Sequence, residues 1–373
     1  MACEKKKHMK KILQLSTLLA VIILFAASCK PTQQIITATS TNGQQYQVYP
    51  VGFYNLENLY HPLSTDSLRD IEFSPTGSNA WTMDKYEKKL TNISFVLNEI
   101  AKEFGGLAAV GVSEVGNRKV MEDLVATKLL KDKGMKIVHH DSPDWRGIDV
   151  GLLYDSTRFE FVSSSMHPFP YEIGIQQGVT DSTFRTRDIL LVDGKIANER
   201  VAILVSHWPS RRGDKSSVSR DLAASVVKHL HDSLIQVDPA MHVIIMGDMN
   251  DDPVDPSCAV VLNAKRYENE VQPGGLFNPM WEKYAKGIGS LCYQGKWNLF
   301  DQIIVSHSLI GNDYSSLKYY RAEVFNRDFL IQKTGRYKGY PFRTFSGGHF
   351  QNGFSDHFPT YIYLVKETPG KNK

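Results

Sequence analysis

Hydrophobic residues recur along this chain at two spacings, which predict alternating helices and strands. The segment 83–104 places apolar residues at intervals of three or four, which predicts an amphipathic helix that ends at a Gly-Gly pair. The same spacing predicts helices over 117–131 and 217–236. Short apolar runs bounded by polar residues predict strands over 48–54, 107–112, 136–140, 242–246, 303–305 and 358–364.

Two further pairs of apolar runs have the spacing of β-hairpins. The runs 150–154 and 159–163 flank Asp155-Ser156-Thr157, and the runs 189–192 and 201–205 flank Asp193-Gly194. Helices between short strands, interrupted by hairpins, predict an α/β fold with mixed sheets rather than a purely parallel sheet.

The first 29 residues have the layout of a secretory signal, with five Lys, an apolar stretch too short to span a bilayer, and a small-residue exit before Cys29. The exit resembles a bacterial lipobox, which implies cleavage before Cys29 and acylation of its thiol. An uncleaved membrane anchor is the alternative, and both predict a lipid-anchored or membrane-held protein in the periplasm or at the cell surface. We therefore expect a signal peptide over 1–29, a flexible tether over 30–46, one domain over 47–366, and a disordered tail over 367–373.

Removal of the signal changes the charge of the chain. Five Lys and one Glu leave with it, so the formal net charge falls from +3 to −1. A protein that holds nucleic acid mainly through its phosphates usually carries a basic face, so tight duplex binding would need a local basic patch. Only Cys258 and Cys292 then remain, and the sequence leaves open whether they pair.

Six polar clusters each lie beside a predicted strand, although they are spread over 300 residues of the chain. Because catalytic side chains of α/β proteins gather at sheet edges, we expect these clusters to form one site. Their oxygen donors are the ligands that hard divalent cations prefer, and zinc-type Cys and His pairs are absent from the sequence. The clusters contain Asn55 and Glu57, Glu114, His207, Asp248 and Asn250, Asp301, and Asp356 and His357.

The order of these clusters resembles the endonuclease/exonuclease/phosphatase superfamily, which includes deoxyribonuclease I. Gly247-Asp248-Met249-Asn250 and Ser355-Asp356-His357 match two motifs of that family, and the resemblance covers roughly residues 48–365. It implies a four-layer sandwich in which two mixed β-sheets are flanked by helices. It also implies metal-dependent hydrolysis of phosphate esters by a monomer, with Mg²⁺ as the cofactor and Mn²⁺ or Ca²⁺ as alternatives.

The resemblance further implies a role for each matching residue. Glu114 would be the principal metal ligand, helped by Asn55, Glu57 and Asp356. His357, paired with Asp301, would act in proton transfer, because the charge of a histidine changes near neutral pH. Asp248 and Asn250 would orient the attacking water and the phosphoryl oxygen. His207 would be the second histidine of the nuclease branch, with Asp149 as its expected carboxylate partner.

Four residues near the clusters are candidate substrate contacts. Arg146 lies where deoxyribonuclease I has a DNA-contacting tyrosine, and Arg187 matches an arginine ahead of a family strand. Trp208 and Arg211 follow His207 in a loop, where they could contact bases or phosphates. Glu57 departs from the Asp of the abasic-site endonucleases by one methylene.

These features favour a DNA nuclease over two other interpretations. A phospholipid phosphodiesterase would suit the predicted anchor, although the sequence shows no long apolar hairpin for entering a bilayer. A catalytically silent binding lipoprotein would be expected to lack a key polar residue, and every cluster is complete.

Overall fold

The computed structural model describes residues 37–40, 43–63, 71–211 and 217–368. The predicted signal peptide, Cys29 and almost all of the predicted tail lie outside the described residues. Part of the predicted tether is a strand instead, because Thr37–Thr39 (β1) pairs with the start of β2. Among the described residues, no helix combines the length and apolar character that a membrane span requires.

The first sheet has seven strands and is mixed. Its order is β15-β18-β2-β3-β5-β4, with β1 beside β2. Strands β2 and β3 are parallel, whereas the other pairs are antiparallel. The remaining strands span Gln45–Leu59 (β2), Ala109–Val115 (β3), Met135–His139 (β4), Asp149–Asp155 (β5), Lys318–Val324 (β15) and Thr360–Glu367 (β18).

The second sheet also has seven strands, in the order β10-β11-β14-β9-β8-β7-β6. Strands β8 and β9 are parallel, as are β10 and β11, and the other pairs are antiparallel. The strands span Phe159–His167 (β6), Ile189–Ile196 (β7), Glu199–His207 (β8), His242–Asp248 (β9), Ala264–Lys265 (β10), Leu276–Phe277 (β11) and Asp301–Ser306 (β14).

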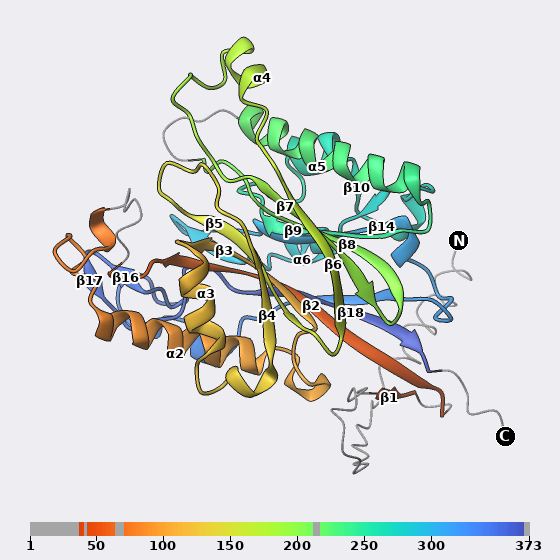
Figure 1. Ribbon diagram of the computed structural model, residues 1–373, viewed down its shortest axis with the longest axis horizontal. Coiled ribbons are helices and arrows are strands. Elements are labelled where there is room, and N and C mark those ends of the chain that lie inside the picture. Colours follow the sequence, from red (N-terminus) through yellow and green to blue (C-terminus); the bar gives the residue numbers. More distant parts are fainter. Residues whose placement is uncertain (1–36, 41–42, 64–70, 212–216, 369–373) are drawn as a thin grey trace.

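The two sheets pack face to face between helices. Figure 1 shows α2 (Met83–Glu99) and α3 (Arg118–Val125) on the outer side of the first sheet and α5 (Ser217–Val237) on the outer side of the second. This confirms the predicted four-layer α/β sandwich. Shorter elements complete the described chain: α4 (Tyr171–Gln176), α6 (Met280–Ala285), and the two-stranded ribbons β12 (Leu291–Tyr293) with β13 (Lys296–Asn298) and β16 (Phe345–Ser346) with β17 (His349–Phe350).

The core between the sheets is closely packed. Side chains such as Phe53, Val205 and Met246 are fully buried there. At Gly111 an added Cβ would lie 2.6 Å from the sulfur of Met246, so only glycine lets the sheets approach this closely. Removing the large side chains of this core would cost about 2–5 kcal/mol each.

The first predicted hairpin is wrong. Strand β5 pairs with β3 and β4 in the first sheet, whereas β6 pairs with β7 in the second, so the turn at Asp155 carries the chain from one sheet to the other. The burial of the two strands explains the difference. Residues 149–153 of β5 are buried on both faces and need a neighbour on each side, whereas β6 is mostly exposed and forms a sheet edge.

The second predicted hairpin is correct, but its turn is displaced. Strands β7 and β8 pair, and the chain turns at Ala197 and Asn198, which both have positive φ. The predicted turn residues lie inside β7 instead. Gly194 is needed there for space, since an added Cβ would lie 2.3 Å from the ring of Phe159.

Other boundaries differ from the sequence pattern for local reasons. Helix α3 begins after the cap residue Asn117, as predicted, but ends at Val125 rather than at 131. The hydroxyl of Thr127 donates to the carbonyl of Leu124 and so competes with further helical turns. Strand β15 was not predicted. Cys258 and Cys292 are both free thiols.

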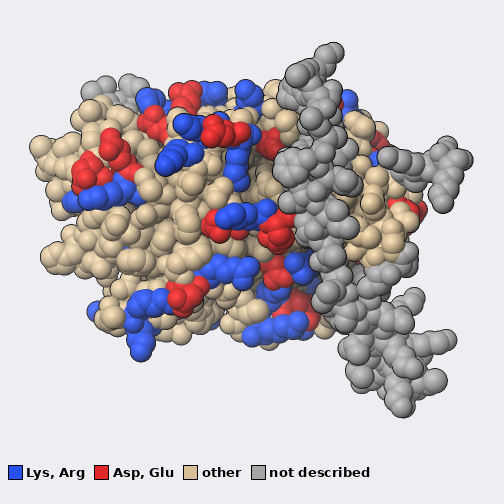
Figure 2. All heavy atoms as spheres, turned by 90° about the horizontal axis from the view of Figure 1, so that it is seen from below, with Lys and Arg blue, Asp and Glu red and all other residues tan. Residues whose placement is uncertain are grey.

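Charged side chains on the surface are largely paired. Figure 2 shows one face of the molecule, where cationic and anionic side chains alternate and do not form a continuous basic band. On α2, for example, Lys88 pairs with Asp84 at 2.9 Å. Such exposed pairs add little stability, but they leave this face without a broad positive field for nucleic acid.

Glu199 connects the two sheets through a partly buried network. At the start of β8, its carboxylate accepts hydrogen bonds from Nε2 of His242 at 2.7 Å and from the peptide nitrogen of Leu317 at 3.0 Å, and it pairs with Nζ of Lys366 at 2.6 Å. Burial alone would raise the pKa of Glu199, but these donors lower it from 4.5 to about 2.

After allowance for solvent screening of this partly exposed group, Glu199→Gln should lower the free energy of unfolding at pH 7 by about 1–2 kcal/mol. Because the folded-state pKa of Glu199 is depressed, its contribution is complete above pH 4.5 and is lost as the pH falls towards 2. Urea unfolding of the variant and the wild type should thus differ at pH 7 and converge near pH 2. Glu160→Gln, which removes an exposed partner of Lys195, is the control and should cost less than about 0.5 kcal/mol. A gap that persisted at pH 2 would contradict this account.

Candidate active site

Five of the predicted site residues lie at the same end of the two sheets. Asn55 is on β2, opposite Ser113 of the neighbouring parallel strand β3, and Glu114 is the next residue of that strand. In the second sheet, His207 on β8 is directly opposite Asp248 on β9, and Asp248 is opposite Asp301 on β14. The parallel pairs β2–β3 and β8–β9 explain the grouping, because their strands end at the same edge.

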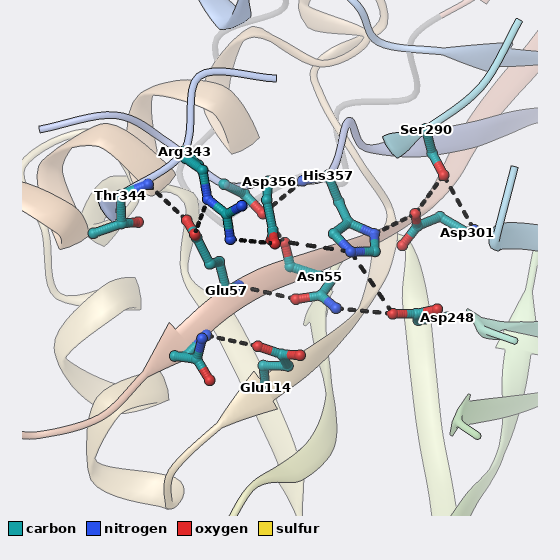
Figure 3. A network of polar contacts seen from close by, with 12 residues as sticks. Asn55, Glu57, Glu114, Asp248, Ser290, Asp301, Arg343, Thr344, Asp356 and His357 are labelled. Atoms are coloured by element: carbon teal, nitrogen blue, oxygen red, sulfur yellow. Dashed lines mark hydrogen bonds and ion pairs between the residues drawn. The ribbon is translucent and has the colours of Figure 1, made fainter. Parts of the chain in front are cut away.

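His357 lies at the centre of this group, in front of β18 (Figure 3). Its Nδ1 is 2.6 Å from Oδ2 of Asp301, and its Nε2 is 3.9 Å from Oδ2 of Asp248. The hydroxyl of Ser290 also donates to Asp301 and holds that carboxylate in place. Burial alone would lower the pKa of His357, but Asp301 and Asp248 raise it well above its usual value. His357 is therefore a buried imidazolium that can donate a hydrogen bond.

Asp248 is a buried carboxyl group with a mixed environment. Its Oδ2 accepts a hydrogen bond from Nδ2 of Asn55 at 3.0 Å and is 3.6 Å from Nε2 of His207. Burial, together with the nearby charge of Asp301, raises the pKa of Asp248 to about 7, against the opposing effect of His357. A carboxyl group with this pKa can gain or lose a proton at neutral pH, as a general base must.

Asn250 follows Asp248 in a conformation that suits asparagine. Its φ is +49°, in the left-handed region, and its peptide nitrogen donates to Oδ1 of Asp248. Its side-chain nitrogen donates to the carbonyl of Trp208 at 3.0 Å. Asn250 thus lies beside Asp248 with a fixed side chain.

His207 belongs to the group, but its predicted partner is wrong. Asp149 accepts a hydrogen bond from His139 at 3.0 Å and another from the peptide nitrogen of Ser142, so it holds a different histidine. The carboxylate near His207 is Asp248. Burial, and then the charge of Arg187, lowers the pKa of His207 well below its usual value, so this imidazole is neutral.

Glu114 lies beside Arg146 at the edge of the group. Its Oε2 accepts a hydrogen bond from the peptide nitrogen of Asn58 at 2.9 Å and is 3.7 Å from Nη2 of Arg146. Arg146 also donates to the side chain of Asn58. Glu114 has a φ of +59° and interrupts the register of β3, which turns its side chain towards β2. Arg146, the predicted substrate contact, therefore lies next to the metal-ligand candidate Glu114.

Glu57, a predicted metal ligand, lies close by, but its carboxylate is bound by neighbouring side chains and backbone. Its Oε1 is bound by Nε of Arg343 at 3.2 Å, and its Oε2 accepts from the peptide nitrogen of Thr344 at 2.7 Å and lies 3.6 Å from Nζ of Lys89. Both oxygens thus already have partners. Arg343 also pairs with Asp356 at 2.9 Å. Sequence reasoning missed Arg343 and Lys89.

Two of the predicted substrate contacts are wrong because the side chains are buried. Nη1 of Arg187 pairs with Asp144 at 3.0 Å, and its other donors bind the carbonyls of His207 and Trp208. The ring of Trp208 is 1% exposed and packs in the core beneath α5. Arg187 holds the backbone at His207 and Trp208 in place, and the ring of Trp208 is part of the core. Neither side chain is therefore available for stacking or for binding phosphate.

Arg211 is partly exposed beside the site, but acidic residues hold it. Its Nη2 contacts Asp251 at 3.0 Å and also Asp255, and its Nε donates to the carbonyl of Asn250. Its guanidinium also lies over the ring of Phe300. These contacts explain its conformation without a substrate.

The donor set suits a hard divalent cation. Asp248, Asp301 and His357 place potential ligand atoms within 4.8 Å of one another, and Oδ1 of Asp301 is buried without a hydrogen-bond partner in the described chain. Because His357 would have to lose its Nε2 proton to bind a cation, the oxygens of Asn55, Glu114 and Asp356 are the better candidates for a metal. A second group, His139 with Asp141 and Asp149, lies outside this set.

Comparison with solved structures shows the same fold in proteins of low sequence identity. An endonuclease/exonuclease/phosphatase family protein from Bacteroides thetaiotaomicron is 14% identical, with a TM-score of 0.51 over 88% of this chain and 99% of that chain. D. rerio TDP2 complexed with a single strand DNA product is 14% identical, with a TM-score of 0.50 over 85% and 98%. A mannosyl-6-phosphatase from Bacteroides thetaiotaomicron is 14% identical, with a TM-score of 0.50 over 85% and 99%.

Sequence comparison identifies the family directly. No curated protein sequence matches the chain. A family model described as the endonuclease/exonuclease/phosphatase family matches residues 50–366, which include all of the second sheet, most of the first and every candidate site residue. The chain therefore belongs to the endonuclease/exonuclease/phosphatase family.

Proposed function

We propose that this chain is a divalent-metal-dependent phosphodiesterase and that DNA is its substrate. The observation that carries the proposal is the position of His357, a buried imidazolium 2.6 Å from Asp301 and 3.9 Å from Asp248. A fixed cationic donor beside a carboxyl group of near-neutral pKa is what attack of water on a phosphate ester requires.

Each residue can be given a step in this reaction. The divalent metal supplies charge neutralisation of the phosphate when it is bound. His357 donates a hydrogen bond to a phosphoryl oxygen, and Asp301 fixes the orientation of its ring. Asp248 accepts a proton from the attacking water, and Asn55 orients Asp248 through the hydrogen bond from its side chain.

The exposed side of the site supports a substrate with planar bases. Trp145 is 55% exposed and directly precedes Arg146, which lies beside Glu114. An exposed indole beside an arginine suits single-stranded nucleic acid, because a base can stack on the indole and a phosphate can pair with the guanidinium. The TDP2 structure of similar fold holds a single strand DNA product.

A phosphomonoester is the second candidate substrate. Arg187 and Trp208, two of the side chains that the nuclease hypothesis uses for contact, are buried, and Arg211 is held by acidic neighbours. Fewer cationic contacts suit a small substrate, and a protein of similar fold is a mannosyl-6-phosphatase.

A substrate panel tests both candidates. The chain from residue 30 onward, which keeps every described residue, would be incubated with Mg²⁺ and plasmid DNA, a single-stranded oligonucleotide, RNA, sphingomyelin, bis-p-nitrophenyl phosphate or mannose 6-phosphate. Nicking or shortening of DNA supports the proposal. Exclusive release of phosphate from the monoester would replace it with the second candidate, and a headgroup released from lipid alone would identify a phospholipase. Failure to bind Mn²⁺ at millimolar concentration would favour a silent binding protein.

We also propose that the mature chain is anchored to a bacterial membrane through acylated Cys29, at the periplasmic or cell surface. The support is the sequence alone, since Cys29 lies outside the described residues. Radiolabelled palmitate should be incorporated in cells that express the wild type and not in cells that express Cys29→Ala. Equal labelling of the two would contradict the anchor.

A further inference from the structure

Arg343 lies on the segment before β18, between two acidic residues of the candidate active site (Figure 3). Its Nε donates to Oε1 of Glu57 at 3.2 Å, and its Nη2 donates to Oδ2 of Asp356 at 2.9 Å. Two carboxylates bound by different nitrogens of one guanidinium fix both its position and the plane of the group.

The carboxylate of Glu57 is itself held from two other directions. Its Oε2 accepts a hydrogen bond from the peptide nitrogen of Thr344 and lies 3.6 Å from Nζ of Lys89. Lys89 has no exposed side-chain surface, and its ammonium group also donates to the hydroxyl of Thr344 and to the carbonyl of Phe354. A buried lysine is costly unless it is paired, so this arrangement is built into the fold and is not an accidental surface contact.

The position of Lys89 also bears on why Arg343 contacts Glu57. The charge of Glu57 is already balanced by the buried ammonium group, so Arg343 is not needed for that purpose. Within the part of the chain that the structure describes, Nη1 of Arg343 donates no hydrogen bond, and 36% of the side chain is exposed. The guanidinium therefore keeps an unused pair of N–H donors beside Asp356, the neighbour of His357.

We propose that Arg343 binds a non-bridging phosphoryl oxygen of the substrate through Nη1, with Glu57 and Lys89 as its positioning residues. A guanidinium suits this use because it is planar and always charged, and can bind a carboxylate and a phosphate at the same time. The proposal rests on the proposed function and names a further substrate-binding residue of the same site. It also assigns Glu57 to the orientation of Arg343 rather than to the metal.

The competing explanation is that Arg343 only separates the charges of Glu57 and Asp356. Removal of the guanidinium would then change the stability of the fold but not the affinity for phosphate. Affinity for inorganic phosphate therefore distinguishes the two explanations, and it can be measured without turnover.

The experiment is isothermal titration of the protein with inorganic phosphate in the presence of Mg²⁺. We expect Arg343→Gln to raise the Kd for phosphate at least about tenfold, since one charged hydrogen bond is lost. Arg343→Lys keeps the charge but loses the fork, and should lie between the variant and the wild type. Arg336→Gln is the matched control, because Arg336 is exposed in the same segment and, among the described residues, its guanidinium lies over the ring of Tyr337 and not beside the site.

Thermal unfolding of each variant shows whether it is folded. If Arg343→Gln does not fold, Arg343→Lys and Glu57→Gln decide the question. Glu57→Gln should raise the phosphate Kd about threefold through a less ordered Arg343, with the Kd for Mn²⁺ unchanged. The proposal would be overturned by a phosphate Kd within twofold of the wild type in folded Arg343→Gln, or in both Arg343→Lys and Glu57→Gln where Arg343→Gln does not fold. It would also be overturned if the wild type did not bind phosphate. Because no step of this test needs hydrolysis, it can succeed even if the substrate panel shows no activity.

Discussion

Replacing His357 by alanine should lower kcat for phosphoester hydrolysis about 10³-fold. The variant loses the only imidazolium of the site that both Asp301 and Asp248 stabilise, and with it the fixed donor to the phosphoryl oxygen. KM should change little, because the lost interaction is strongest when charge develops on the phosphate. Initial rates with bis-p-nitrophenyl phosphate or with the best substrate of the panel would measure this effect.

Substitution of Asp301, the hydrogen-bond partner of His357, tests the same prediction in a second way. Asp301→Asn should also lower kcat, and the double variant should be about as slow as His357→Ala alone, because the two side chains act as one unit. His140→Ala is the control, since His140 is exposed and bonds only to Ser164. Independent, multiplying effects of the two substitutions would show that Asp301 does not act through His357.

The fold was largely predictable because its signals are local. The apolar runs that became β3, β9 and β18 are short and continuous, and such runs are buried wherever they lie in a sheet. The assignment of strands to sheets was not local. The turn at Asp155 looks the same whether the next strand returns to its own sheet or crosses to the other. Tertiary packing distinguishes the two cases, through the burial of β5 on both faces and the packing of Phe159 into the core.

The site was predictable to a similar degree. Asp248, Asp301 and His357 were identified because each lies beside a strand and carries a distinctive motif, and the structure brings them together. The predicted substrate contacts of Arg187 and Trp208 were wrong because a sequence does not show which way a side chain faces. Arg187 faces the buried carboxylate of Asp144, and Trp208 faces the core.

Lys89 and Arg343 were not predicted as site residues because their roles depend on tertiary contacts with Glu57. Lys89 lies on the buried face of α2, where a lysine in a helical pattern is normally read as solvent-exposed. Its partner Glu57 is 32 positions earlier, and Thr344 is 255 positions later. A polar residue that interrupts the apolar side of an amphipathic helix was the one available signal, and it indicates a buried charge pair.

The second large effect concerns Glu114 and the metal. Glu114→Gln should lower activity about 10³-fold and weaken Mn²⁺ binding at least about tenfold, because an amide lacks the negative charge that a hard cation prefers. Raising the Mg²⁺ concentration should restore part of the activity, whereas EDTA should abolish that of the wild type. Titration calorimetry with Mn²⁺ and initial rates against Mg²⁺ concentration measure the two effects. Glu122→Gln is the control, since Glu122 is exposed on α3 and pairs only with Arg118.

Two groups of side chains compete for the metal, and Glu114→Gln distinguishes them. If oxygens from β2 and β3 hold the ion, metal affinity depends on Glu114, and Asp248→Asn lowers kcat without a comparable loss of Mn²⁺ binding. If the ion sits among Asp248, Asp301 and His357, the dependence is reversed, and His357 must bind it through an Nε2 that has lost its proton, because Asp301 can offer its unpartnered Oδ1 and still hold Nδ1. Loss of that proton would leave the imidazole neutral, whereas Asp301 and Asp248 favour its cationic form. A site that needs both the cationic histidine and the metal is therefore consistent with the first arrangement and not with the second.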